Sequence, residues 1–158
     1  MKNKQLLIVG HAPSPNTKHL CEALLEGAQS TEIEAVTSRW LSPFDCDASQ
    51  VLGADALVVF TTENFGYMNG ALKDWFERVY YPCLEQPKLN DGKPYALVVK
   101  AGNDGQGAIQ SVQRIINGLK WKEAMPVTLC QGEFKQQFSA DCHTLGLTIA
   151  ASLDADII

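Results

Sequence analysis

The chain has 158 residues and a formal net charge of −5, from 13 basic and 18 acidic residues. This length suits a single domain over residues 1–158, and a mildly acidic chain without basic clusters argues against nucleic acid or an anionic membrane as a partner. No stretch approaches the roughly 18 consecutive apolar residues of a membrane helix, and the N-terminal apolar run is too short for a secretion signal. The five cysteines form no C-x-x-C pair. We therefore expect buried free thiols in a cytoplasmic protein.

Short apolar runs alternate with longer segments of helical periodicity along the chain. Five runs predict β-strands, at residues 5–9, 33–37, 56–60, 95–100 and 127–130. The first, third and fourth are almost continuously apolar, as in parallel strands buried on both faces. Amphipathic helices are predicted after the first, third, fourth and fifth runs, and Pro82 is expected to end the second of these helices. Between the second and third strands, only residues 48–52 are expected to be helical.

This alternation predicts an α/β fold with three layers, αβα. Its centre would be a doubly wound, five-stranded parallel sheet of strand order 2-1-3-4-5, joined by right-handed crossovers. In such a sheet, ligands bind at the carboxyl ends of the strands, where the order reverses between strands one and three. The loops after the first, third and fourth predicted strands are therefore the places where a site is expected.

The first of these loops joins a buried strand to a helix and has the chemistry of an anion site. Ser14 is a good N-cap and Pro15 suits the first helical position, so the helix would begin here with its N–H groups pointing outward. The hydroxyls of Ser14 and Thr17 and the amide of Asn16 add donors. The loop lacks both the Walker pattern and the G-x-G-x-x-G fingerprint. It suits a terminal phosphate monoester, although a plain helix cap without a ligand explains the same residues.

The second and third loops have features that suit a flat heterocycle. In the second, Asn64 could bond a ring edge, and Phe65 or Tyr67 could pack on a ring face or, equally, lie in the core. The third loop, residues 100–108, holds three glycines that let the backbone approach a ligand closely, or form an ordinary turn. Together, the three loops predict a mononucleotide with a large heterocycle, and FMN is the natural candidate.

Three stretches resemble the flavodoxin-like NAD(P)H-dependent FMN reductase and quinone reductase family. They are SPNT after the first strand, TTENFGYMNGALKDWFERV after the third and GNDGQGAIQSVQRIINGLKW after the fourth. The resemblance covers nearly the whole chain and implies a flavodoxin-like fold with FMN as the cofactor. It implies that the FMN phosphate lies near Ser14, Asn16 and Thr17. The isoalloxazine ring is implied to lie near a set of residues from the other two loops: Thr62, Glu63, Asn64, Phe65, Gly66, Ala101, Gly102 and Asn103.

The phosphate loop departs from the flavodoxin pattern at two positions. Ala12 stands where that pattern has a hydroxyl, and Pro15 stands where it has a glycine. Proline has no N–H, so one donor is lost. His11 could supply another donor to a cofactor, or it could be an inert loop residue.

The function expected from these features is that of an oxidoreductase. NAD(P)H would bind transiently and reduce FMN, and the flavin would pass electrons to a quinone or similar small acceptor. The flavin supplies the chemistry, so neither a catalytic side chain nor a metal is expected. A flavodoxin-type electron carrier is an alternative, but such carriers usually clamp the ring between two aromatics, and residues 101–107 contain none. A flavin-free binding module is another. Trp40 and Phe44 are expected at the ligand edge, where they would close the pocket, help to form a homodimer, or merely pack on the sheet end.

Overall fold

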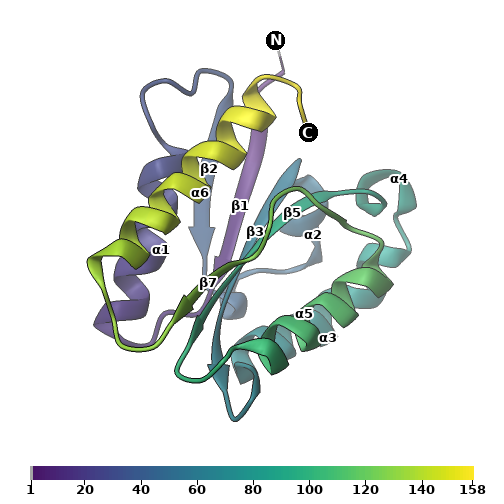
Figure 1. Ribbon diagram of the computed structural model, residues 1–158. Helices are drawn as coiled ribbons and strands as arrows, with labels where there is room; N and C mark the ends of the chain where they lie inside the picture. The colour runs from purple at the N-terminus through teal and green to yellow at the C-terminus, as the bar shows by residue number, and fades with distance from the viewer. Residues whose placement is uncertain (1) are drawn as a thin grey trace.

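The computed structural model describes residues 2–158 and shows a parallel sheet between two layers of helices (Figure 1). The elements, in chain order, are β1 (Lys4–Gly10), α1 (Pro15–Ala28), β2 (Val36–Leu41), the 3-10 helix η1 (Pro43–Asp45), α2 (Ala48–Gly53), β3 (Ala56–Asn64), β4 (Tyr67–Met68), α3 (Gly70–Leu84), α4 (Pro87–Asn90), β5 (Pro94–Ala101), α5 (Gln106–Leu119), β6 (Lys122–Glu123), β7 (Thr128–Gln131) and α6 (Gln136–Asp154). Within the described residues, none of the helices has the length and apolar character needed to cross a membrane.

The sheet confirms the predicted fold class and strand order. Strands β2, β1, β3 and β5 lie side by side in parallel, and β6 and β7 both pair with β5 at the fifth position. The predicted fifth strand, residues 127–130, corresponds to β7, and β6 is an additional two-residue strand that was not predicted. Pro126 lies between the two pieces and cannot donate a ladder hydrogen bond. The register pairs Gly10 with Phe60 and Thr62 with Lys100. The carboxyl ends of β1, β3 and β5 therefore meet at one edge.

Three of the predicted elements have boundaries that differ from the prediction by more than one residue. β2 spans Val36–Leu41 rather than residues 33–37, because this edge strand has a single buried residue, Ser38, and no continuous apolar run marks it. β3 extends to Asn64, because it continues into a hairpin with β4. α3 does not end before Pro82 but includes it. This proline is exposed in the last turn, where its missing N–H removes only one helical hydrogen bond.

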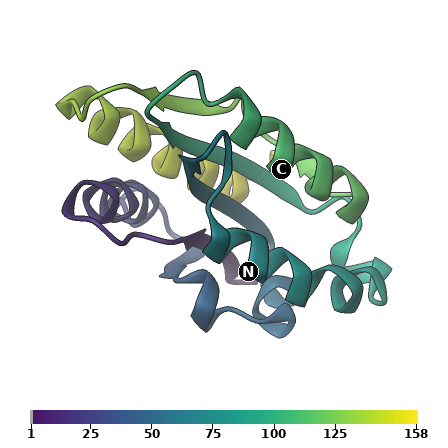
Figure 2. The same ribbon diagram turned by 90° about the horizontal axis from the view of Figure 1, so that it is seen from below.

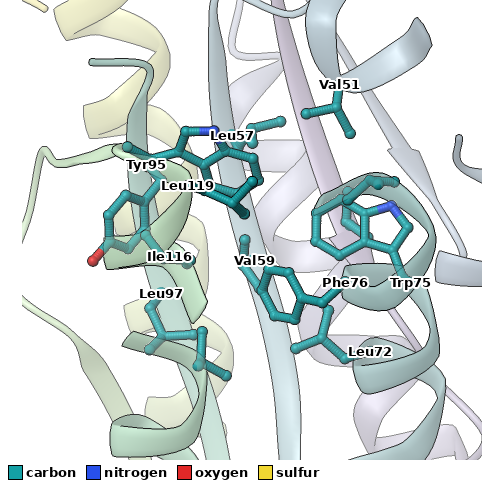
Figure 3. Packing of buried hydrophobic residues seen from close by; sticks show 14 of the residues in the cluster. Val51, Leu57, Val59, Leu72, Trp75, Phe76, Tyr95, Leu97, Ile116 and Leu119 are labelled. Carbon is teal, nitrogen blue, oxygen red and sulfur yellow. The ribbon is translucent and has the colours of Figure 1, made fainter. Parts of the chain in front are cut away.

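The core lies on both faces of the sheet. The cluster beneath α3 and α5 includes Leu57, Val59, Trp75 and Phe76 (Figure 3). The cluster on the other face packs α1 and α6 against alternate residues of the same strands, and Figure 2 separates these two helix layers. The burial predicted for the five cysteines is confirmed. The sheet is therefore covered on both faces, and the strands position the loops at its carboxyl edge.

Candidate functional site

The first candidate segment leaves β1 and forms the start of α1. Ser14 has extended backbone angles and caps the helix: its Oγ accepts the N–H of Thr17 at 3.2 Å, and Thr17 Oγ1 accepts the N–H of Ser14 at 3.1 Å. Ser14 and Asn16 are exposed, whereas Thr17 is buried. The predicted cap is therefore present. The exposed hydroxyl and amide beside the positive end of the helix dipole also form a suitable environment for an anion.

Aromatic residues from β2 and η1 lie beside this first loop. The half-buried ring of His11 makes an edge contact with Phe44, with the ring centroids 5.5 Å apart. Trp40 Nε1 donates a hydrogen bond to the carbonyl oxygen of Gly10 at 2.9 Å. These contacts place Trp40 and Phe44 at the expected edge. Phe44 remains largely exposed.

The segment predicted as a loop after the third strand is a two-residue β-hairpin. Glu63 pairs with Met68 and Asn64 with Tyr67, and the tip projects beyond the sheet at the bottom of Figure 1. The turn residues Phe65 and Gly66 have φ values of 54° and 71°. Positive φ at both positions is typical of a type I′ turn, for which Asn-Gly is favoured. Phe65 has a relative exposure of 106%, so it does not lie in the core.

Glu63 connects the hairpin to the third loop. Its Oε1 accepts the backbone N–H of Asn103 at 2.9 Å, and its Oε2 accepts the N–H of Gly105 at 2.8 Å. Bonds to a charged carboxylate are among the stronger hydrogen bonds in proteins. The carboxylate and these two N–H groups are therefore engaged within the protein. Sequence reasoning missed this role because no local pattern indicates a partner about forty residues away.

The glycines of the third loop allow α5 to pack directly on the hairpin. A Cβ added to Gly107 would lie 1.8 Å from the carbonyl oxygen of Gly66, so no larger residue fits without a shift. Gly102 and Asn103 are exposed, and a Cβ on Gly102 would meet open space. Ala101 is fully buried at the end of β5, so its side chain faces the core. The open part of this loop is thus residues 102–103.

No activated thiol lies beneath the first loop. Cys21 packs against the end of β1, where a Cβ added to Gly10 would lie 3.0 Å from its Sγ. Burial, with a smaller effect from the charge of Glu22, raises the pKa of this thiol to about 12. Cys21 is therefore a protonated core residue at neutral pH.

The three loops bring two kinds of chemistry to one edge of the sheet. Exposed hydrogen-bond donors at the start of α1 suit a phosphate group. In the hairpin, Thr62 is half-buried and its Oγ1 donates to Asn64 Oδ1 at 2.9 Å, leaving the amide nitrogen of the exposed Asn64 for a ligand. The exposed aromatics Phe65 and Tyr67, near the open Gly102, suit a planar ring. The available side chains thus suit an anion at one end of the site and a planar ring at the other.

The sequence matches no family model and no curated protein. Solved structures are nevertheless similar in fold. A flavodoxin from the domain Archaea superposes with a TM-score of 0.77 at 20% identity, over 94% of this chain and 97% of that one. A flavodoxin, WrbA-like protein from Agrobacterium tumefaciens gives 0.73 at 14% identity, over 98% and 99% of the chains. The flavodiiron protein from Giardia intestinalis gives 0.74 at 18% identity, over 95% of this chain and 36% of that one. These likenesses show that the chain has a flavodoxin-like fold.

Proposed function

We propose that this protein binds FMN at the carboxyl edge of β1, β3 and β5 and acts as a flavin-dependent oxidoreductase. The observation that carries the proposal is the conformation of Phe65, whose aromatic ring is fully exposed at the tip of the hairpin and whose φ is 54°. A left-handed backbone costs a residue with a side chain roughly 1–2 kcal/mol. No burial of the ring offsets this cost, and strain without a folding gain is a feature of functional positions.

Different residues would contact the two ends of the cofactor. The phosphate would contact the hydroxyl of Ser14, the amide of Asn16 and, at the end of β1, the ring of His11. The isoalloxazine would lie beside the hairpin, with Phe65 against it and Asn64 at its edge. Because Glu63 already accepts the N–H groups of Asn103 and Gly105, its role would be to hold the two loops in position rather than to contact the ring.

Bound FMN would supply electron transfer, and the protein would bind and orient it. We further propose that NAD(P)H is the transient electron donor and that a quinone or similar small molecule is the acceptor. This proposal is supported by the absence of a side chain at Gly102, which leaves room beside the loop. The fold neighbours include a WrbA-like protein and a rubredoxin oxygen:oxidoreductase.

The second candidate function is that of an electron carrier. Flavodoxins are prominent among the fold neighbours, and a carrier would use the same edge of the sheet for its flavin. The two functions differ in whether a reduced nicotinamide can approach the bound ring and transfer a hydride to it.

The test begins with a titration of FMN into the purified protein, followed by flavin fluorescence and the visible spectrum. Stoichiometric quenching at micromolar concentrations is expected, and Asn16→Ala should weaken it, whereas Asn117→Ala at the far end of α5 should not. NADPH or NADH is then added without oxygen. Rapid bleaching supports the reductase; bound but unbleached flavin supports the carrier. If FMN does not bind, both functions are wrong.

A further inference from the structure

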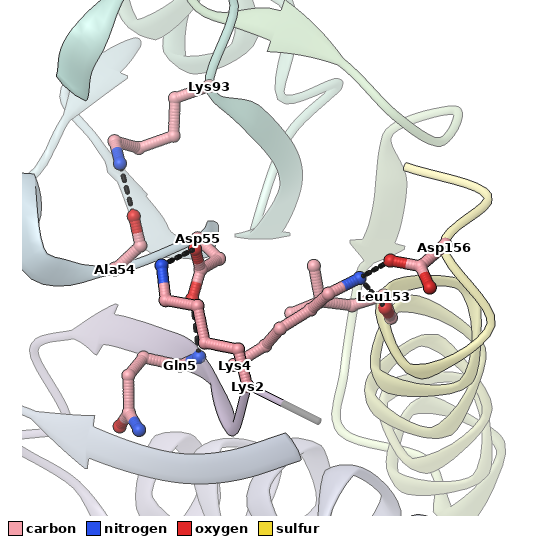
Figure 4. A network of polar contacts seen from close by, with 8 residues as sticks. All are labelled: Lys2, Lys4, Gln5, Ala54, Asp55, Lys93, Leu153 and Asp156. Atoms are coloured by element: carbon pink, nitrogen blue, oxygen red, sulfur yellow. Dashed lines mark hydrogen bonds and ion pairs between the residues drawn. The ribbon is translucent and has the colours of Figure 1, made fainter. Parts of the chain in front are cut away.

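A pocket of ≈ 760 Å³ lies at the amino edge of the sheet, opposite the candidate flavin site. It is formed by the end of α2, the residues that precede β3, the short helix α4 and the residues that precede β5. Lys2, Lys88 and Lys93 line it, together with Asp55 and Asp91. Figure 4 shows the polar contacts of Lys2, Asp55 and Lys93 in this region. The proposed flavin function makes no use of these groups.

Lys93 is the unusual residue of this pocket, because its side chain is charged and its relative exposure is only 6%. Its Nζ donates a hydrogen bond to the carbonyl oxygen of Ala54. An ammonium group has three donors, and among the described residues this carbonyl is the one acceptor that it contacts. No carboxylate within 2–158 forms an ion pair with it. Burial lowers the pKa of Lys93, against an opposing effect of the Asp55 charge.

The two carboxylates of the pocket are occupied by other groups. Asp55 accepts the N–H of Gln5 at 2.8 Å and lies 4.0 Å from the ammonium of Lys2. Asp91 lies 3.8 Å from the ammonium of Lys120. Lys88 is exposed and, like Lys93, has no ion-pair partner in the described part of the chain. Lys88 and Lys93 are therefore the two lysines of this pocket without an ion-pair partner in the described residues, although the charge of Asp55 acts on Lys93 from a longer distance.

The backbone offers few free N–H groups for an anion in this pocket. The N–H groups of Ala54, Asp55 and Gly92 are already bonded to carbonyl oxygens of the protein. Anion binding here would thus depend on the lysines, which act on oxyanions as compact point charges. A dianion would match the charges of Lys88 and Lys93, and it would supply acceptors for the buried ammonium.

We propose that this pocket binds a small oxyanion, such as the phosphate group of a small metabolite, between Lys88 and Lys93. The test is a titration of isotope-labelled protein with inorganic phosphate, followed by NMR, with ionic strength held constant by chloride. Saturable shifts are expected at the amides of Ala54 and Gly92. Lys93→Met and Lys88→Met should each weaken binding at least tenfold, and Lys73→Met, on α3 and outside this pocket, should leave it unchanged.

Two results would overturn the proposal. One is the absence of saturable shifts at Ala54 and Gly92, including the case in which phosphate shifts only the amides near Ser14. The other is binding that survives both lysine substitutions. If Lys93→Met does not fold, Lys88→Met decides the question alone, because Lys88 is exposed and its replacement leaves the core intact.

Discussion

Replacing Phe65 with asparagine should stabilise the protein. Phe65 has φ of 54° and is followed by Gly66 with φ of 71°, and asparagine before glycine is favoured in this turn. The left-handed conformation costs residues with a Cβ roughly 1–2 kcal/mol, and asparagine tolerates it best. The ring has a relative exposure of 106%, so its removal sacrifices no buried apolar area. The expected gain is about 1 kcal/mol, or roughly 2–4 °C in Tm for a chain of this length.

The same substitution should weaken FMN binding. An aromatic contact with a ring is worth about 0.5–1.5 kcal/mol beyond area burial, which corresponds to up to about a tenfold increase in Kd. A gain in stability combined with a loss of affinity is expected when a strained residue serves a ligand rather than the fold.

The assays are urea unfolding of the protein without FMN and fluorescence titration with FMN. Phe44→Asn is the control for stability, because Phe44 is also exposed but does not have a positive φ; it should bring no gain. If Phe65→Asn fails to stabilise the protein, the strain argument is wrong. If it leaves the Kd for FMN unchanged, Phe65 does not contact the ring.

Three other substitutions test the remaining parts of the structure. Glu63→Ala should destabilise the protein by about 2 kcal/mol, since it removes two hydrogen bonds to a charged, half-buried acceptor, whereas Glu133→Ala, at an exposed position, should be near neutral in urea unfolding. Ser14→Ala should cost about 1 kcal/mol through the lost N-cap of α1 and raise the Kd for FMN; Asp47→Ala, which removes the cap of α2, should leave that Kd unchanged. Burial holds the pKa of Lys93 below its ordinary 10.5 in the folded protein. As the pH approaches 10.5, Lys93 therefore binds more protons in the unfolded chain than in the folded one, and the free energy of unfolding of the wild type rises with pH. Lys93→Met should therefore stabilise the protein most at neutral pH, and urea unfolding should show this difference shrinking toward pH 10.5; a constant difference would contradict the assignment.

Local sequence patterns were sufficient to predict the central strands of the sheet and the start of the first helix. Continuous apolar runs identified β1, β3 and β5, because strands covered by helices on both faces need apolar residues at every position. The serine-proline pair identified the start of α1 through cap chemistry that involves only neighbouring residues. The patterns did not predict the bounds of β2, the additional strand β6 or the position of Pro82 inside α3. Edge strands and helix ends leave weaker periodic signals.

The contacts between loops were decided by the tertiary structure. The sequence indicated polar and aromatic residues after the third strand, but not that Glu63 would bridge to Asn103 and Gly105, or that Phe65 would be exposed at a hairpin tip. Likewise, nothing in the sequence distinguished Lys93 from the other lysines, although it is the buried one that lines the amino-edge pocket. The spacing of apolar residues in a sequence indicates which positions of a helix or strand face the core. Which backbone groups of distant loops form hydrogen bonds depends on how those loops pack at the end of the sheet, and only the tertiary structure determines that packing.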